Sequence, residues 1–134
     1  MASLRPADSL PLLPPLLHLT YVQNTGAAFG LFKGWSILFV GISAVVIVWI
    51  MWEFATRLTS LSPLTVWGSA FVLGGAVGNL LDRVRLGYVI DFLDLRVWPV
   101  FNVGDCAITI GIGLLLLHGL PKKVSDTFQS GKGV

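Results

Sequence analysis

The sequence predicts an α-helical membrane protein with three transmembrane helices and a small β-containing segment outside the cytoplasm. Of its 134 residues, 54% are hydrophobic and only 12% are charged, and the mean hydropathy is +0.81. Soluble domains carry about 25% charged residues, and disordered chains combine low hydropathy with high net charge. The length allows a single domain, and a formal net charge of +2 is too small for a nucleic-acid-binding surface.

Three stretches without charged residues account for the predicted helices. They contain 19, 24 and 16 residues and cover 34–52, 58–81 and 106–121. A bilayer core about 30 Å thick needs about 20 apolar residues, so the first two are long enough and the third must reach the interface at its ends. We therefore expect transmembrane helices over 34–53, 62–81 and 105–121. Tryptophans, which favour the membrane interface, lie near the ends of the first two: Trp35, Trp49, Trp52 and Trp67.

Residues 1–33 are predicted to form an extracytoplasmic β-rich segment rather than a helix. Prolines at positions 11, 14 and 15 interrupt its uncharged part, and Asn24-Thr25-Gly26 is typical of a turn. The run from His18 to Val22 alternates and is rich in β-forming residues, which predicts a short strand before that turn.

The charges around the helices predict their orientation. Lysines follow the third helix, and positive residues prefer the cytoplasm, so 122–134 is expected to be a cytoplasmic tail. With three spans, residues 1–33 and an active-site loop at 82–104 then both lie outside. Arg83, Arg85 and Arg96 in that loop oppose the trend and need another role.

Four of the seven acidic residues fall within 24 positions, namely Asp82, Asp91, Asp94 and Asp105. Carboxylates at a membrane edge are costly, which makes them functional candidates. We expect Asp82 and Asp94 to pair with neighbouring arginines in a solvated loop. Asp91 lies inside an apolar run, and Asp105 begins the last helix, where a helix cap is its alternative role.

Two carboxylates brought together at a membrane edge predict aspartic protease chemistry. Like charges at close range share one proton, so one carboxylate can accept a proton from water while the other donates to a carbonyl. A serine–histidine arrangement fits poorly, because His118 lies about 20 Å along the helix from Asp105. No ligand cluster for a metal is present and no cofactor is expected. An ion-conducting protein would need its acids near the bilayer midplane, and these cluster at one predicted face.

Two further residue types have structural interpretations. Gly74 and Gly78 form a small-xxx-small pair, which predicts a helix–helix contact. Cys106 is the single cysteine, and we expect it to be a buried small residue rather than a nucleophile.

Three segments together resemble the lipoprotein signal peptidases, the type II signal peptidases of bacteria. They are 24–30 (NTGAAFG), 74–83 (GGAVGNLLDR) continuing through 87–92 (GYVIDF), and 101–108 (FNVGDCAI). The resemblance covers roughly residues 16 to 120. It implies a membrane-embedded aspartic peptidase that cuts the signal peptide from lipid-modified prolipoproteins just before the diacylglyceryl-cysteine.

The resemblance also implies roles for particular residues. Asp91 and Asp105 match the catalytic pair. Five more residues match polar positions that line the family's active site: Asn24, Gly26, Asn79, Arg83 and Asn102. The implied location is the bacterial plasma (inner) membrane, with the active site at the extracytoplasmic face and with prolipoprotein and membrane phospholipid as partners.

The sequence departs from the family pattern in two places. The family has four transmembrane helices, whereas this chain begins Met1-Ala-Ser-Leu-Arg-Pro and enters the extracytoplasmic segment almost directly. We expect the first helix to be missing, through a late start or truncation, which removes a wall of the substrate cleft. The alternative function is therefore that of a catalytically inactive truncated homologue. Gly104 also stands where the family usually has Ala, which should loosen the helix start without touching the chemistry.

Overall fold

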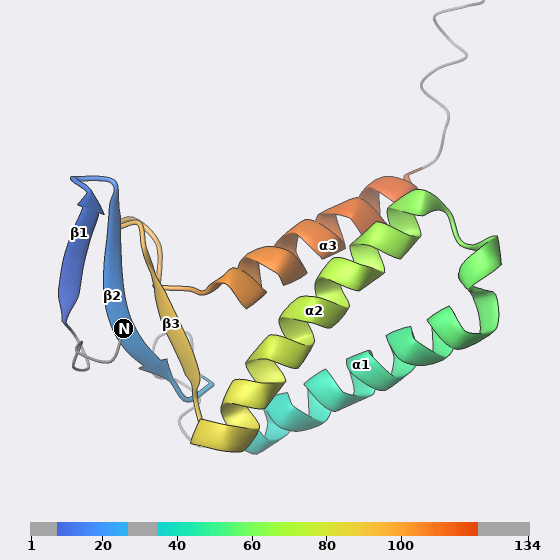
Figure 1. Cartoon of the computed structure of the whole chain (residues 1–134), viewed down its shortest axis with the longest axis horizontal. Helices are drawn as coiled ribbons and strands as arrows, with labels where there is room; N and C mark the ends of the chain where they lie inside the picture. Colours follow the sequence, from blue (N-terminus) through green and yellow to red (C-terminus); the bar gives the residue numbers. More distant parts are fainter. Residues whose placement is uncertain (1–7, 27–34, 121–134) are drawn as a thin grey trace, which may run out of the picture.

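Three helices extend from a small antiparallel sheet that lies at one end of the molecule (Figure 1). The computed structural model describes residues 8–26 and 35–120; the expected cytoplasmic tail and part of the N-terminal segment lie outside them. The helices are α1 (Ser36–Arg57), α2 (Pro63–Leu86) and α3 (Val103–Gly119), and the short 3-10 helix η2 (Leu58–Ser60) leads from α1 to α2. The strands are β1 (Ser9–Leu13), β2 (Leu17–Asn24) and β3 (Val89–Asp94).

Two of the described helices are long and apolar enough to cross a membrane. The qualifying segments are Ser36–Ser60, with mean hydropathy 2.3, and Pro63–Leu86, with mean hydropathy 1.5. Only 6% of the apolar window in the first is buried inside the chain, so its side chains face outward along most of the helix. A core helix of a soluble protein would be covered, and an apolar helix this exposed is typical of contact with lipid. α3 is also apolar, and its 17 residues lie at the short end of the spanning range.

The helices end at other residues than expected. An uncharged stretch marks where a helix lies, but the helix can continue through the charged residues that follow it. α1 continues past 53 to Arg57, and α2 continues past 81 to Leu86. α2 ends where Gly87 adopts φ +83° and its N–H donates to the Arg83 carbonyl at 2.9 Å. The expected loop 82–104 therefore begins with the last turn of α2 and contains a strand, and α3 spans Val103–Gly119 rather than 105–121.

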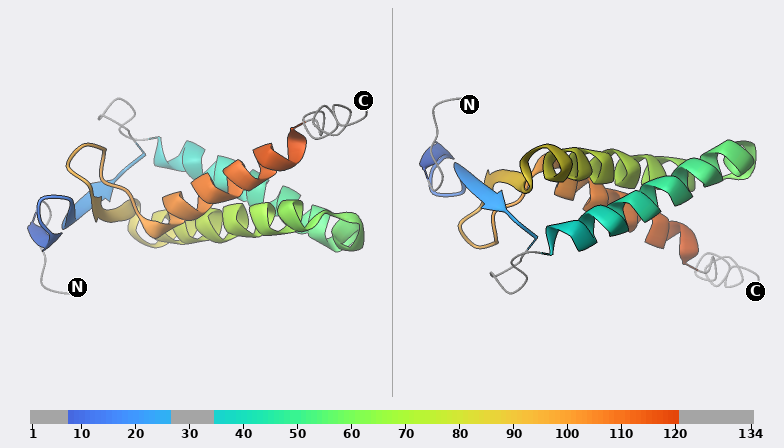
Figure 2. Two further views of the ribbon diagram at one scale, coloured as in Figure 1. Left: turned by 90° about the horizontal axis from the view of Figure 1, so that it is seen from above. Right: turned by 90° about the horizontal axis from the view of Figure 1, so that it is seen from below.

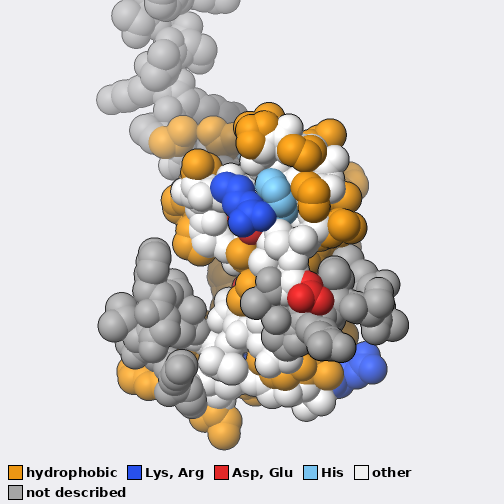
Figure 3. Space-filling model, turned by 90° about the vertical axis from the view of Figure 1, so that its left-hand side faces the viewer, with side chains coloured by type: hydrophobic (Ala, Val, Ile, Leu, Met, Phe, Trp, Pro, Cys, Tyr) orange, Lys and Arg blue, Asp and Glu red, His pale blue; other side chains and the backbone are white. Residues whose placement is uncertain are grey.

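The sheet joins the N-terminal segment to the chain between α2 and α3. β2 lies in the middle, antiparallel to both neighbours, with Asn24 opposite Val89 and Val22 opposite Asp91. The expected strand around 18–22 lies within β2. The sequence did not predict β1, whose Pro11 is tolerated because the strand is at the edge of the sheet. Seen from this end, hydrophobic side chains are spread among a few charged ones (Figure 3).

α2 and α3 pack closely enough for their backbones to touch (Figures 1 and 2). A Cβ on Gly75 of α2 would collide with the backbone carbonyl oxygen of Gly104 in α3. One heptad away, a Cβ on Gly111 would lie 2.5 Å from the carbonyl oxygen of Gly68. Pairs of glycines seven residues apart on both helices therefore set the distance between them.

The expected helix contact through Gly74 and Gly78 is wrong. Among the residues that the structure describes, no atom of a neighbouring segment lies within 4 Å of a Cβ built at either position. Of the three glycines at 74, 75 and 78, it is Gly75 that contacts α3, from an adjacent face of α2. The small-xxx-small spacing therefore predicted the wrong pair.

Asp94 and Asp82 have different surroundings from those expected. Asp94 pairs with Arg96, as predicted, with 3.6 Å between Arg96 Nε and Asp94 Oδ2. It is buried rather than solvated, and accepts hydrogen bonds from Thr20 Oγ1 (2.7 Å) and the Arg96 backbone N–H (2.8 Å). Asp82 accepts the backbone N–H of Ile90 (3.2 Å) and so ties the end of α2 to β3. Asp94 therefore links β3 to β2, and Asp82 links the sheet to α2.

Replacing Gly75 with alanine should destabilise the protein by about 1–3 kcal/mol, because the new methyl group must displace the backbone at the start of α3. Gly74→Ala and Gly78→Ala are the matched controls; alanine has open space there, and its higher helix propensity should leave stability unchanged or raise it by up to about 1 kcal/mol. Thermal unfolding midpoints in detergent measure the difference. Equal effects of the three substitutions would contradict this packing.

Thr20→Val should cost about 1.5–3 kcal/mol at neutral pH, because it removes a hydrogen bond to a buried carboxylate. The hydrogen bond from Thr20, followed by that from the Arg96 N–H, lowers the pKa of Asp94 below its ordinary value. This stabilisation is present above the unfolded-state pKa, about 3.9, and is lost as the pH falls through the lower folded-state value. The difference in unfolding midpoint between the Thr20→Val variant and the wild type should therefore become smaller below about pH 4. Thr56→Val, which loses only a bond to a backbone carbonyl in α1, should show a gap that does not change with pH.

Candidate active site

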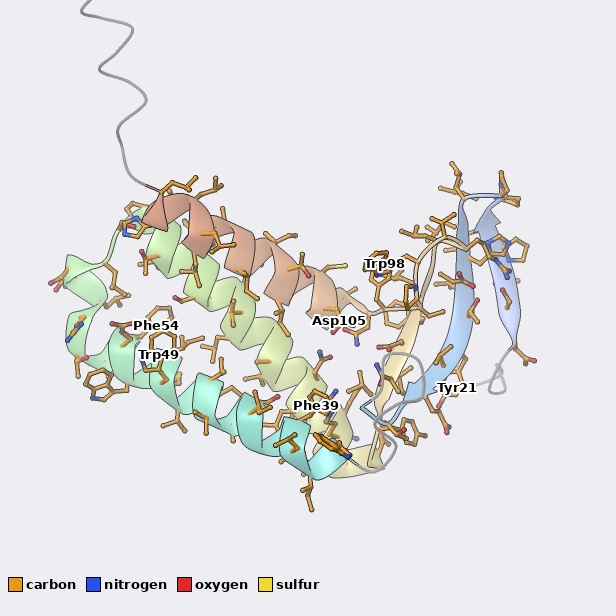
Figure 4. All side chains as sticks on the ribbon, turned by 180° about the vertical axis from the view of Figure 1, so that it is seen from behind. Tyr21, Phe39, Trp49, Phe54, Trp98 and Asp105 are labelled. Carbon is orange, nitrogen blue, oxygen red and sulfur yellow. The ribbon has the colours of Figure 1, made fainter. Side chains whose placement is uncertain are left out.

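The polar residues predicted for the site converge where the sheet meets α2 and α3. β2 contributes Asn24 at its last residue, and β3 contributes Asp91. α2 contributes Asn79 from its buried face, and the start of α3 contributes Asn102 and Asp105. Figure 4 shows Asp105 at the first turn of α3, facing the sheet. Residues separated by up to 81 positions thus meet in one cluster.

Asp91 is buried and held by two side-chain amides. Only 2% of its surface is exposed. Asn24 Nδ2 donates to its Oδ2 at 2.8 Å, and Asn102 Nδ2 donates to its Oδ1 at 2.7 Å. The backbone N–H of Gly26 donates to Asn24 Oδ1 at 2.9 Å, which fixes which end of that amide faces the carboxyl group. Each oxygen of Asp91 therefore has a defined donor.

Asp105 caps α3 while it faces the cluster. Its Oδ2 accepts the backbone N–H of Asn102 (3.2 Å), and its own N–H donates to Asn102 Oδ1 (3.1 Å), which is a complete capping box. The expectation that Asp105 could be a helix cap is therefore confirmed. Its other oxygen, Oδ1, accepts Asn79 Nδ2 at 2.9 Å, so capping does not use the whole carboxyl group.

Two asparagines connect the two carboxyl groups. Asn102 Nδ2 donates to Asn79 Oδ1 at 3.1 Å as well as to Asp91, and Asn79 in turn donates to Asp105. Both asparagines are buried, so these bonds form with little competition from water. A Cβ on Gly104 would lie 2.9 Å from the Oδ1 atoms of both. A side chain at position 104 would therefore press on this asparagine network. From the sequence, Gly or Ala at this position was expected to affect only the start of the helix.

Burial raises the pKa of Asp91 above its ordinary value. The amide hydrogen bonds from Asn24 and Asn102 oppose this by favouring the ionised form, as does the positive charge of Arg83, while the charge of Asp105 adds to the rise. The result is a buried carboxyl group that keeps its proton to higher pH than an exposed aspartate does. Such a perturbed group in a polar cluster is typical of a functional site.

Arg83 lies beside this cluster on the last turns of α2. Its guanidinium carbon lies 5.2 Å from the centre of the Phe39 ring, and Nη1 lies 3.5 Å from the Asn79 carbonyl oxygen. Its Nε is buried without a hydrogen-bond partner among the residues that the structure describes. Phe39 also contacts the turn at Gly26, where φ is +108° and an added Cβ would lie 2.9 Å from the ring. The rest of that motif, 27–30, lies outside the described residues.

A groove runs from Asp105 along the first turns of α3, and the sequence did not predict it. Its volume is about 490 Å³. We call it the α3 groove, and its walls are Leu95, Trp98, Phe101, Asp105, Cys106, Thr109 and Ile110. An exposed tryptophan close to the acidic residues was the available signal. Cys106 is half-buried in this wall rather than in a core.

Other chemistries find no support in the described ranges. No group of three or more His, Cys, Asp or Glu side chains there could hold a metal ion. His118 lies at the far end of α3, where its Nδ1 is 3.0 Å from Ser62 Oγ, away from both aspartates.

Comparison with known proteins identifies the family. Residues 1–120 match the family model described as signal peptidase (SPase) II. A lipoprotein signal peptidase of Halothermothrix orenii is 44% identical over 119 residues, which span 88% of this chain and 80% of that protein. One of Moorella thermoacetica is 49% identical over 111 residues, spanning 83% and 73%.

Solved structures agree with the fold. Two structures of bacterial membrane enzymes match with a TM-score of 0.79 each, at 26% and 28% sequence identity. The matches cover 98% and 90% of this chain and 80% of each solved chain. The arrangement of apolar helices and a small sheet is therefore that of these membrane enzymes. The chain belongs to the signal peptidase II family.

Proposed function

We propose that this protein is a membrane aspartic endopeptidase that removes the signal peptide from diacylglyceryl-modified bacterial prolipoproteins. The observation that carries this proposal is the pair of carboxyl groups, Asp91 and Asp105, linked through Asn102. The names of the relatives, all lipoprotein signal peptidases, support the substrate class.

In the proposed reaction the two carboxyl groups share one proton. Asp91 is the protonated member, because burial favours its neutral form, and Asp105 is the base. The Asp105 carboxylate takes a proton from a water molecule whose oxygen attacks the scissile carbonyl carbon, while the neutral carboxyl group protonates the carbonyl oxygen. The tetrahedral gem-diol intermediate then breaks its C–N bond: Asp105 gives the proton it took from water to the leaving amine, and a hydroxyl of the gem-diol returns a proton to Asp91 as the product carbonyl forms. The pair returns to its starting state.

The neighbouring polar residues orient this pair. Asn24 and Asn102 direct amide hydrogens at Asp91, and Asn79 directs one at Asp105. Gly26 fixes the Asn24 amide. Arg83 supplies a positive charge near both carboxyl groups, and its buried Nε has no hydrogen-bond partner among the residues that the structure describes.

The proposed location is the bacterial plasma membrane, crossed by α1, α2 and α3, with the sheet and the site on the extracytoplasmic side. The N-terminus of α1, the C-terminus of α2 and the N-terminus of α3 all lie at the sheet end, which supports a site on one face of the membrane (Figure 2). Phospholipid then surrounds the helices. A catalytically inactive homologue is the alternative function, and the assay below distinguishes the two.

Asp91→Asn and Asp105→Asn should each reduce cleavage of a diacylglyceryl-modified prolipoprotein by at least about 10³-fold, because each removes a proton donor or acceptor. A gel-shift cleavage assay in detergent or lipid measures this. Asp82→Asn is the matched control, since an asparagine oxygen can still accept the Ile90 N–H and activity should stay within a few fold. Substantial activity in either of the first two variants would refute the mechanism. A folded wild-type chain with no activity would favour the inactive homologue.

Asn24→Ala should move the alkaline limb of the pH–activity profile to higher pH. The Asn24 amide stabilises ionised Asp91, so its removal raises the pKa of Asp91 further, and the shared proton is kept to higher pH. The measurement is kcat/KM against pH for the variant and the wild type. Gln23→Ala, which changes a neighbour hydrogen-bonded to Tyr88 instead, should leave the limb in place. A shift to lower pH would contradict the assignment of the proton to Asp91.

A further inference from the structure

The turn between β1 and β2 consists only of leucine and proline. Residues 12–17 read LLPPLL, and no Asp, Glu, Lys or Arg lies between Asp8 and Lys33. We call residues 12–17 the apolar turn. Turns that face water are rich in Gly, Asn, Asp and Ser, which tolerate turn geometry and bond to water or to their own backbone. Six consecutive Leu and Pro residues indicate a different surrounding.

The leucines of this turn are not covered by any residue that the structure describes. All five residues of β1 are exposed, and the exposed fractions of Leu13 and Leu16, which flank the two prolines, are 63% and 71%. β1 is also an edge strand of the sheet. Edge strands that face water usually carry charged side chains, which prevent pairing with other molecules. β1 carries none, so its exposed leucines need an apolar neighbour.

The backbone of the apolar turn suits a surrounding with little water. Pro14 and Pro15 have no N–H group, and neither has Pro11 in β1. The Leu16 N–H donates to the Leu13 carbonyl oxygen at 2.7 Å, which closes the turn. An unpaired backbone N–H is costly in lipid, so a turn with few donors left over can approach the hydrocarbon more closely than a polar one.

The sheet holds the apolar turn to one side of the helix bundle. In Figures 1 and 4 the strands run crosswise over the end of the bundle, from the end of α2 past the start of α3 to the turn. Asp82 of α2 fixes the other end of the sheet by accepting the Ile90 N–H. Figure 3 shows hydrophobic side chains along the upper edge of this face, where the turn lies. With the helices across the membrane, a sheet in this position lies along the membrane surface, and the turn overhangs it beside α3.

We propose that the apolar turn inserts into the interface of the extracytoplasmic leaflet and anchors the sheet to the membrane beside α3. The partner of this surface is phospholipid. The leucines gain from leaving water, and the prolines leave no N–H to be desolvated. Because the turn has no charged side chain, it recognises the apolar part of the interface and not an anionic headgroup. The inference depends on the membrane location of the helices and not on the proposed catalysis.

Spin labels on single cysteines test the depth of the turn in nanodiscs of phosphatidylcholine. The labelled variants are Leu13→Cys and Leu16→Cys in the full chain, with Cys106→Ala as the background. Ser9→Cys, at the start of β1, is the control within the sheet. Val45→Cys, at a 70% exposed position of α1, is the reference for lipid contact. Molecular oxygen concentrates in lipid and a nickel chelate in water, so the ratio of their collision rates with the label reports depth. Unfolding midpoints show that each variant is folded.

The ratio of oxygen to nickel collision rates at Leu13→Cys and Leu16→Cys should be at least about threefold higher than at Ser9→Cys, as expected for an apolar element in the interface. It should approach the ratio at Val45→Cys. A ratio equal to that at Ser9→Cys would place the turn in water. Low collision rates with both reagents would place it under protein instead, and either result would overturn the proposal.

A matched pair of charged substitutions tests whether the leucines hold the turn in the membrane. With the label on Leu12→Cys, Leu16→Asp should lower the collision ratio at least about threefold, because a carboxylate resists transfer out of water. Gln23→Asp adds the same charge at an exposed position near the other end of β2 and should leave the ratio unchanged. Equal ratios in the two variants would overturn the proposal.

Discussion

The side chain of Asn102 is the contact on which the site depends. Its amide nitrogen donates to Asp91 and Asn79, and its oxygen accepts the N–H of Asp105. Because an asparagine amide has one acceptor and two donors, these three bonds determine its orientation completely. The sheet, α2 and α3 each supply one of the partners. A shift of any of these elements would break a bond of this residue, which is why the carboxyl groups have a defined relation to each other.

The approach of α2 and α3 makes this arrangement possible. Asn79 can reach Asp105 only because Gly75 and Gly104 let the two backbones touch one turn away. In a membrane, burial of apolar surface does not draw helices together, and close packing between small residues does much of that work. The same glycines that hold the helices together therefore also bring an amide donor to the Asp105 carboxyl group.

Most residues that meet in the candidate site were singled out from the sequence, whereas fewer of the features around them were. Asp91 in an apolar run and Asp105 at a helix start were recognisable, because a carboxylate near lipid has few structural uses. Asn24, Asn79 and Asn102 came from the family resemblance, and the structure places all three on the carboxyl pair.

Other features could not be read from the sequence, because they depend on the approach of distant segments. The groove needs the loop after β3 to lie over α3, and the local pattern around Trp98 does not contain that information. The choice of Gly75 over Gly74 and Gly78 depends on the rotation of α2 about its own axis. The helix ends at Arg57 and Leu86 were missed because hydropathy marks a lipid-facing stretch and not the last hydrogen-bonded turn.

The two carboxyl groups affect the stability of the fold in opposite ways, because only Asp105 belongs to the capping box. Functional residues often sit in unfavourable surroundings, so that replacing them makes a protein more robust. Asp91 fits that pattern, since an ionisable group is held there out of water. Asp105 does not, because its carboxylate begins α3 by capping the backbone. Selection for stability alone would retain a hydrogen-bond acceptor at position 105 but would not retain an ionisable group at position 91, so Asp91 is the residue expected to change first in a homologue that lacks the proposed activity.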